Sequence, residues 1–256
     1  MDNHPDVPRK RKRKHRRSVA VGLWIIKRLE GFIRRHSTVG TTPFFDPLQI
    51  PGTQLLEQQW PTVLRELQSV LTHSEAIPNF QDISKDQKRI TQDDHWKTFF
   101  LYGYGYKMEG NCLECPETTR IVESIPGMTT AFFSILSPGK HIPPHRGPYN
   151  GLLRVHLGLI IPQPQENCRI QVGDEIRHWQ VGECLVFDDS YRHQVWNDTD
   201  GMRVVLFLDI QRPLDRAGRL LNRTILKLIQ LSPFIQDARR NHQEWEKKRN
   251  AQVRLN

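Results

Sequence analysis

Histidines and arginines that could bind a metal or an anion are concentrated in a part of the chain built from short apolar runs. The histidines lie at the ends of these runs or within them: His145, His156 and His193. Arg154 and Arg203 lie inside apolar runs, where burying a cation is unfavourable unless an anion accompanies it. Imidazoles bind transition metals, and a guanidinium recognises carboxylates. These residue types therefore indicate a metal site with an anionic co-substrate.

His145 and His193 are the best candidates for metal ligands. His145 follows the Pro143–Pro144 turn, and His193 opens an apolar run after a polar corner, so neither position is typical of core packing. Neutral imidazoles suit Fe(II), Zn(II) or Cu(II), and many iron oxygenases add a carboxylate two residues after the first histidine. That position is Gly147 here. The residues alone therefore indicate a metal with two protein ligands.

Four separated motifs resemble the aspartyl/asparaginyl β-hydroxylase family in their order and spacing. They are HRGPYN, LRVHLGL, FDDSYRHQVWN and RVVLFLDIQRP, and the similarity extends over about residues 96–213. The family consists of double-stranded β-helix dioxygenases that use Fe(II) and 2-oxoglutarate. Its members have glycine where most of the superfamily carries the metal-binding carboxylate, and Gly147 matches this pattern.

The resemblance implies roles for six residues. Two take the positions of the catalytic iron ligands, His145 and His193. Four match residues that bind the 2-oxoglutarate co-substrate: Arg203 at its distal carboxylate, Ser134 as a further contact, and Arg154 and His156 near its other end.

Three expectations concern the surroundings of this site. We expect Arg203 to follow the same sheet inward as the second ligand histidine. We expect only one of Arg154 and His156 to face the metal, with the other on the opposite face of their strand. Asp188 and Asp189 could supply a carboxylate or orient a ligand, but we favour a tight turn, which is the commoner role of such residues.

Turn residues separate seven short β-rich runs, which predicts a mainly β sandwich or barrel rather than an α/β fold. Together with the resemblance, this pattern predicts a double-stranded β-helix of the jelly-roll or cupin type, with flanking N- and C-terminal helices. The expected strands are 129–136, 153–161, 168–172, 175–180, 183–187, 193–197 and 203–210.

The basic character of the chain comes from its N-terminal segment. The net charge is +9, and residues 1–36 hold twelve Lys or Arg but only three Asp or Glu, so the remainder is balanced. The basic cluster continues into an apolar stripe at helical spacing, which is typical of an interfacial membrane anchor. We therefore expect this segment to associate with a membrane surface rather than with nucleic acid.

The remaining organisation follows from composition. A Thr/Pro/Gly-rich linker is expected at 37–52, a dioxygenase domain with a helical lead-in at 53–213, and basic helices at 214–256. No run of about 20 apolar residues exists for a spanning helix, and the four cysteines are expected to be free thiols in a reducing compartment. We expect an uncleaved cytoplasmic chain in peripheral contact with the inner face of the membrane.

The segment after Pro213 is expected to be a helix with two distinct faces. One face carries the cations Arg216, Arg219, Arg223 and Lys227, and the opposite face carries Leu221, Ile225, Leu228 and Ile229. Both a helix packed on the barrel and a helix on a membrane surface fit this pattern.

The resemblance implies hydroxylation of an unactivated C–H bond with O2 and 2-oxoglutarate. Family members hydroxylate the β-carbon of Asp or Asn residues in proteins, whereas a bacterial branch more similar to this chain hydroxylates the 2-position of an acyl chain on lipid A. The basic ends of the chain fit contact with a membrane surface, and this favours an acyl substrate. Two alternatives stay open: a halogenase that uses the open iron position, and a non-catalytic β-helix binding module.

Overall fold

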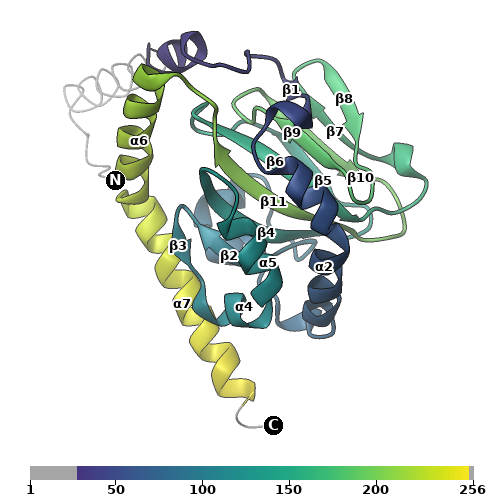
Figure 1. Cartoon of the computed structure of the whole chain (residues 1–256). Helices are drawn as coiled ribbons and strands as arrows, with labels where there is room; N and C mark the ends of the chain where they lie inside the picture. Colours follow the sequence, from purple (N-terminus) through teal and green to yellow (C-terminus); the bar gives the residue numbers. More distant parts are fainter. Residues whose placement is uncertain (1–27, 254–256) are drawn as a thin grey trace, which may run out of the picture.

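The computed structural model describes residues 28–253, and it consists of two facing antiparallel β-sheets with helices on the outside (Figure 1). The strands are β1 Phe44–Phe45, β2 Trp96–Gly103, β3 Tyr106–Lys107, β4 Met128–Leu136, β5 His141–His145, β6 Leu152–Ile160, β7 Cys168–Val172, β8 Glu175–His178, β9 Cys184–Phe187, β10 His193–Asn197 and β11 Arg203–Gln211. The large sheet has the order β1-β9-β6-β11-β4-β2-β3, and the small sheet has the order β5-β10-β7-β8.

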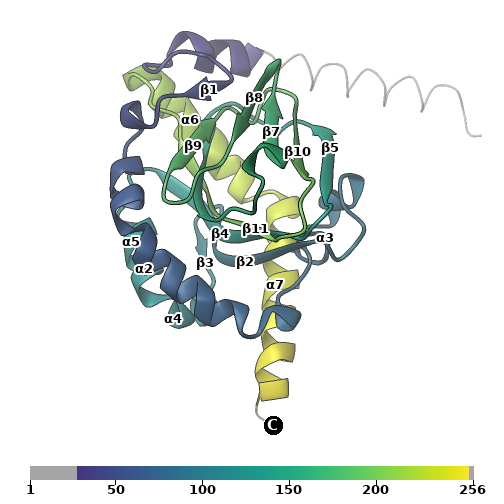
Figure 2. The same ribbon diagram turned by 90° about the vertical axis from the view of Figure 1, so that its right-hand side faces the viewer.

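Helices cover the outside of the large sheet and extend beyond it. The α-helices are α2 Thr53–Leu71, α3 Phe80–Ile83, α4 Glu109–Glu114, α5 Pro116–Glu123, α6 Arg216–Gln230 and α7 Pro233–Val253, and residues 28–35 are also helical. Four 3-10 helices are η1 Pro47–Gln49, η2 Ser74–Ala76, η3 Lys85–Arg89 and η4 Gln165–Asn167. Figure 2 shows α2 and α5 together along one side of the molecule, with α7 extending away from the sheets.

The two faces of the large sheet belong to different hydrophobic clusters. Along β6, Leu153, Val155 and Leu157 point outward and pack with buried residues of α2 and α5. On the neighbouring β11, Val205 and Phe207 point the other way, into a cluster shared with the small sheet. Because side chains alternate along a strand, each central strand serves both clusters. The space between the sheets is therefore the interior that polar site residues must enter.

The expected double-stranded β-helix with flanking helices is confirmed. All seven expected strands are present, with ends shifted by at most two residues. Of the four further strands, β2 and β3 lie in the aromatic run 96–107, and β1 and β5 were not expected. In β5 the prolines Pro143 and Pro144, read from the sequence as a turn, lie in a strand at the edge of the small sheet, where a missing backbone N–H is tolerated.

The N-terminal part of the chain differs from its expected organisation. Residues 37–52, expected as a linker, contain β1, which pairs with β9, and bury Phe44, Phe45 and Ile50. Of the expected membrane-associating segment 1–36, residues 1–27 lie outside the described part of the chain. Within residues 28–253, no helix combines the length and apolar character that crossing a membrane requires.

Candidate active site

His145 and His193 lie side by side in the small sheet. They are directly opposite each other on the paired strands β5 and β10. Their ring centroids are 4.1 Å apart. His193 is almost completely buried, with 3% of its surface exposed, whereas His145 is half-buried. The structure thus brings the two predicted ligands together at one point of the interior.

Backbone hydrogen bonds fix the tautomer of both rings. Nδ1 of His145 lies 2.9 Å from the carbonyl oxygen of Pro143, and Nδ1 of His193 lies 3.0 Å from that of Tyr191. A carbonyl oxygen only accepts, so each Nδ1 carries the proton and donates it. Each Nε2 therefore keeps its lone pair. This second bond to the imidazole is the arrangement that orients histidine ligands in metal sites.

The environment keeps both imidazoles neutral. Burial lowers the pKa of His145, and the nearby Arg154 cation lowers it further. Burial, followed by His145 and Arg154, lowers the pKa of His193 to about 3. At neutral pH neither ring needs to lose a proton before it binds a metal. The pair could hold Fe(II), Zn(II) or Cu(II).

The protein offers no third ligand at position 147. A Cβ added to Gly147 would overlap the carboxylate of Asp189, which fills the space that a side chain there would take. Within residues 28–253, no group of three or more His, Cys, Asp and Glu is arranged to hold a metal ion. The two histidines are thus the predicted ligands that the structure assembles.

Asp188 and Asp189 lie in a turn, as expected, but both side chains are buried. Asp188 pairs with the buried Arg212. Asp189 pairs with Arg154 at 2.9 Å. Burial raises the pKa of Asp189 to about 6, against the opposing effect of Arg154. These carboxylates therefore lie in a turn and also form buried ion pairs with two arginines.

Arg154 and His156 both point into the space between the sheets, so the expectation that they lie on opposite faces is wrong. They are two residues apart on β6, and such residues share a face of a regular strand. Arg154 lies 4.3 Å above the ring of Phe207, and the ring of His156 lies 5.1 Å from the same ring. Arg154 also bonds to Asp209 at 3.0 Å, its neighbour on β11.

His156 carries a buried donor without a partner. Nε1 of Trp179 donates to its Nδ1 at 3.2 Å, so the ring proton of the neutral imidazole lies on Nε2. Nε2 has no hydrogen-bond partner. Burial lowers the pKa of His156 well below its usual value, and the cations Arg203 and Arg154 lower it further. The interior thus presents an unused N–H group.

Arg203 is a buried cation without an acidic partner among the described residues. It begins β11 in the large sheet, so the expectation that it shares a sheet with His193 is wrong; it reaches the interior from the opposite sheet. Its exposed fraction is 1%. The guanidinium lies 4.8 Å above the Trp179 ring, its Nη1 reaches Ser134 Oγ at 3.4 Å, and its Nε has no partner. Burial lowers its pKa to about 10, so it stays charged at neutral pH.

Ser134 lies on β4, the strand that pairs with the strand of Arg203. Its Oγ accepts a hydrogen bond from Trp96 Nε1 at 3.1 Å. Ring contacts connect this end of the interior to the ligand pair, passing from His193 through Phe187 and His156 to Trp179. The six predicted site residues therefore line one interior. Their ligand and co-substrate roles stay predictions.

Trp179 and Asp209 contribute to the site without having been singled out from the sequence. Trp179 contacts both His156 and Arg203. Asp209 holds Arg154. A signal existed for Asp209, because it is the only acidic residue inside the apolar run 203–210 and Arg154 is a cation inside another such run. Opposite charges in two buried runs indicate paired strands.

The fold and these residues define a class of protein: a double-stranded β-helix with a metal-competent histidine pair and a buried cation between its sheets. The model of the aspartyl/asparaginyl β-hydroxylase family matches residues 57–213. The chain belongs to this family of hydroxylases, which confirms the resemblance found in the four motifs.

Three relatives show how much of each protein is shared. The chain is 46% identical over 224 residues to the ornithine lipid ester-linked acyl 2-hydroxylase of Rhizobium tropici, covering 88% of this chain and 80% of that protein. It is 31% identical over 179 residues to human aspartyl/asparaginyl β-hydroxylase, covering 67% of this chain and 23% of that protein. It is 34% identical over 183 residues to human aspartate β-hydroxylase domain-containing protein 2, covering 68% and 48%.

Proposed function

We propose that this protein is an Fe(II)- and 2-oxoglutarate-dependent hydroxylase whose substrate is an acyl chain of a membrane lipid. The overall reaction converts the substrate C–H, 2-oxoglutarate and O2 to the alcohol, succinate and CO2. The bound ferrous ion supplies the oxidising chemistry, and the protein supplies binding and orientation. His145 and His193 would hold the ion through Nε2.

The buried, unpaired guanidinium of Arg203 is the observation that carries this proposal. A cation taken out of water without a counter-ion costs several kcal/mol, so natural proteins rarely keep one unless a ligand supplies the anion. A planar guanidinium suits a carboxylate because it can donate two parallel hydrogen bonds. The unused Nε–H of Arg203 fits this role. Ser134 would add a contact beside the same carboxylate.

A dicarboxylate would meet a second donor between Arg203 and the histidine pair. The Nε2–H of His156 is a second buried donor without an acceptor. Arg154 is already held by Asp189 and Asp209, so its charge is largely compensated. We therefore assign His156 a direct hydrogen bond to the co-substrate and Arg154 mainly an electrostatic contribution near the ligand pair.

The acyl substrate is favoured by the extent of similarity. The relative named for acyl 2-hydroxylation matches 88% of this chain, including regions outside the β-hydroxylase domain, whereas the human β-hydroxylase matches 67%. The two reactions share their chemistry. The 2-position of an ester-linked acyl chain and the β-carbon of Asp or Asn are both CH2 groups next to a carbonyl carbon. The β-carbon of a protein Asp or Asn is accordingly the second candidate.

The test compares both substrates in one assay. Full-length protein reconstituted anaerobically with Fe(II) receives 2-oxoglutarate, O2 and either a lipid with ester-linked acyl chains or an Asp-containing peptide. We expect lipid-dependent succinate release and a gain of one oxygen atom at the 2-position, detected by mass spectrometry. Oxygen on the peptide alone would transfer the proposal to the second candidate. Absence of succinate with either substrate, while 2-oxoglutarate still binds, would favour a non-catalytic binding module.

The halogenase alternative has a structural obstacle. A halide that takes the place of the missing ligand side chain would need the space beside Gly147, which the Asp189 carboxylate fills. Adding bromide to the same assay tests this point. We expect the hydroxylated product without any brominated one.

A further inference from the structure

The outward face of α6 is unusually apolar for a surface helix. Leu220, Leu228 and the helix-ending Leu231 are exposed to 72%, 65% and 61%. Of the apolar residues predicted on one face of this helix, Ile225 and Ile229 pack against a buried cluster, whereas Leu228 is exposed. The residues that α6 buries are Gly218, Asn222 and Leu226.

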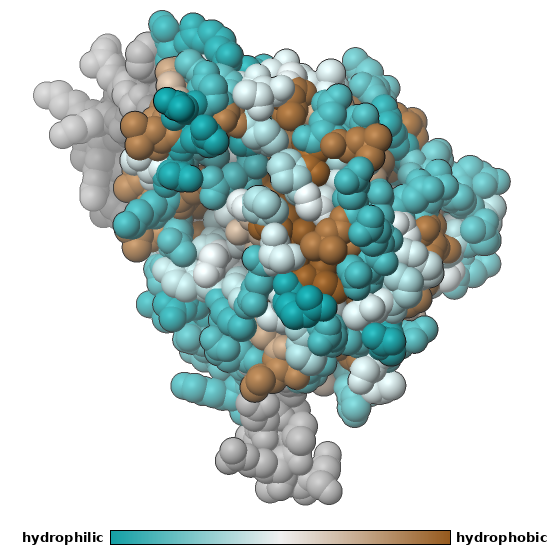
Figure 3. Space-filling view, viewed as in Figure 1, coloured by the Kyte–Doolittle hydropathy of each residue, from teal (hydrophilic) through white to brown (hydrophobic). Residues whose placement is uncertain are grey.

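Four cations lie beside these leucines on the exposed side of α6. Arg216, Arg219, Arg223 and Lys227 are all exposed, and none of them forms an ion pair with a described residue. α6 itself contains no acidic residue. Other surface helices behave differently: the exposed Arg120 of α5 pairs with Glu117 three residues earlier. Figure 3 shows hydrophilic and hydrophobic surface side by side over α6, at the upper left of the molecule.

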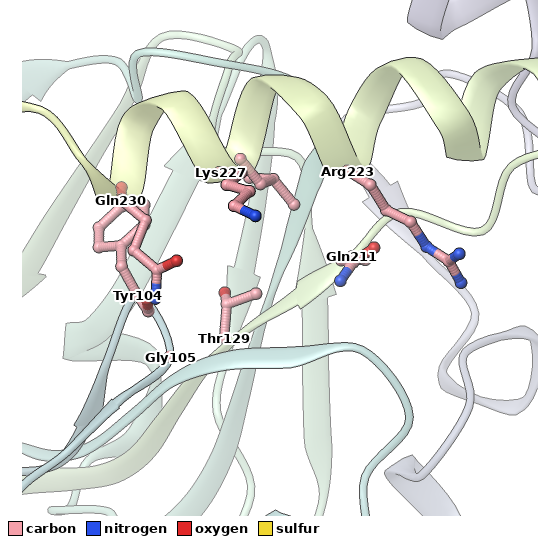
Figure 4. A pocket seen from close by; sticks show the side chains of 8 residues that line it. Tyr104, Gly105, Thr129, Gln211, Arg223, Lys227 and Gln230 are labelled. Carbon is pink, nitrogen blue, oxygen red and sulfur yellow. Dashed lines mark hydrogen bonds between the residues drawn. The ribbon is translucent and has the colours of Figure 1, made fainter.

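A pocket of about 250 Å³ opens beneath this helix. Figure 4 shows Arg223 and Lys227 reaching from α6 towards the sheet beside Gln211 and Thr129. Thr129 Oγ1 donates to the backbone oxygen of Asp209, and Gln230 Nε2, at the end of α6 itself, donates to that of Tyr104. The lining includes two cations, Arg223 and Lys227, and no acidic residue, so the pocket suits an anionic group.

The pocket and the helix both adjoin the candidate active site. Tyr104 lines the pocket. Burial raises the pKa of its hydroxyl, and the carboxylates of Asp209 and Asp189 raise it further, so the acids that hold Arg154 are nearby. On its inner side, Asn222 of α6 accepts from Tyr149 Oη at 2.9 Å and donates to Gly151 O at 3.0 Å. Both contacts lie in the segment that follows His145.

We propose that α6 lies on the surface of a membrane that contains anionic lipids. The three leucines enter the acyl region, the four cations contact anionic head groups, and the pocket beneath Arg223 and Lys227 receives the anionic group of one lipid. Charge complementarity and the mixture of exposed leucines with unpaired cations on one helix face are the features of an interfacial helix. This surface goes beyond the proposed hydroxylation, and binding to it needs no turnover.

Site-specific fluorescence tests whether the leucines enter a bilayer. The four native cysteines are buried, so an environment-sensitive thiol probe can be placed on Leu228→Cys, with Leu113→Cys on α4 as the control at another exposed leucine. We expect a blue shift at 228, and none at 113, with phosphatidylglycerol/phosphatidylcholine vesicles. Overturning results are no shift at 228 on protein that sediments with the vesicles, an equal shift at both positions, or a shift with duplex DNA in place of vesicles.

A second pair of full-length variants tests the cations. Arg223→Gln with Lys227→Gln should weaken vesicle binding roughly 20-fold, since each basic residue near an anionic surface contributes about a fivefold factor. Arg65→Gln with Lys88→Gln removes two exposed cations from other elements and keeps the same N-terminal segment. Equal weakening in the two double variants would show that only total charge matters and would overturn the assignment to α6. Sedimentation without 2-oxoglutarate keeps this result independent of catalysis.

Discussion

Replacing Arg203 by methionine removes a buried charge while keeping much of the side-chain volume. Burial lowers the pKa of this guanidinium from 12.5 to about 10, which corresponds to about 3 kcal/mol of unfavourable free energy for the charged form. The contact with the Trp179 ring at 4.8 Å offsets about 1–2 kcal/mol of this when desolvated. We therefore expect the free energy of unfolding of Arg203→Met, without co-substrate, to be unchanged or about 1–2 kcal/mol higher.

The affinity of Arg203→Met for 2-oxoglutarate should be lower than that of the wild type. A hydrogen bond to a charged group contributes about 1.5–3 kcal/mol, so loss of a two-bond contact to a carboxylate removes about 3–4 kcal/mol. This converts to a rise of roughly 100- to 1000-fold in the KM for 2-oxoglutarate. Arg203→Lys keeps a charge but not the planar pair of donors, and it should fall between the two.

Two measurements decide the matter: urea unfolding without co-substrate, and succinate release as a function of 2-oxoglutarate concentration. Arg120→Met, at an exposed arginine of α5, is the control and should change neither. If Arg203→Met lowered the free energy of unfolding by about 3 kcal/mol or more, the guanidinium would be a structural group. An unaltered KM in a folded variant would remove the co-substrate role.

Three further predictions follow from the same site. His193→Ala should lose bound iron and all succinate release, measured by elemental analysis after anaerobic loading; a variant that retained one iron per chain would contradict the ligand assignment. The folded state holds the pKa of His156 below 6.5, so the unfolded chain takes up a proton that the folded chain does not, and stability falls as pH falls below 6.5. Between pH 7 and 5, the unfolding free energy of metal-free wild type should therefore drop by about 2 kcal/mol more than that of His156→Gln; equal drops would mean that buried His156 becomes protonated. Gly147→Ala should lower the free energy of unfolding by about 1–3 kcal/mol because its Cβ overlaps Asp189, whereas Gly31→Ala, with open space around it, should not; similar effects in both would show that Asp189 moves aside freely.

The sequence predicted the parts of the site that depend on local pattern. Turn residues and short apolar runs located seven strands, and the histidines at the ends of two runs were correctly expected to meet. The prediction that Arg154 and His156 lie on opposite faces of their strand was wrong because side chains alternate with a period of two, so residues 154 and 156 share a face. That error could have been avoided from the sequence alone.

Other features depend on partners that are distant in the chain. Arg203 follows the strand of His193 by only a few residues, but the chain crosses to the opposite sheet between them, and periodicity cannot show such a crossing. The turn at Asp188 and Asp189 was predictable from turn chemistry. Their burial was not, because it requires cations from other elements, Arg212 and Arg154.

The apolar face predicted for α6 is largely its inner face, because Ile225 and Ile229 pack against a buried cluster, but Leu228 is exposed and two non-apolar residues share that inner face. Gly218 and Asn222 face the protein, and Asn222 is buried because its amide bonds to the backbone and to Tyr149. Hydrophobic periodicity assigns such a polar contact to the outside.

Each predicted ligand histidine donates its orienting hydrogen bond to the carbonyl two residues earlier in the chain. The bonds that orient both imidazoles are thus made by local backbone and not by the opposite sheet. Metal uptake should then require little ordering of either ring, and the empty and loaded proteins should share one backbone conformation.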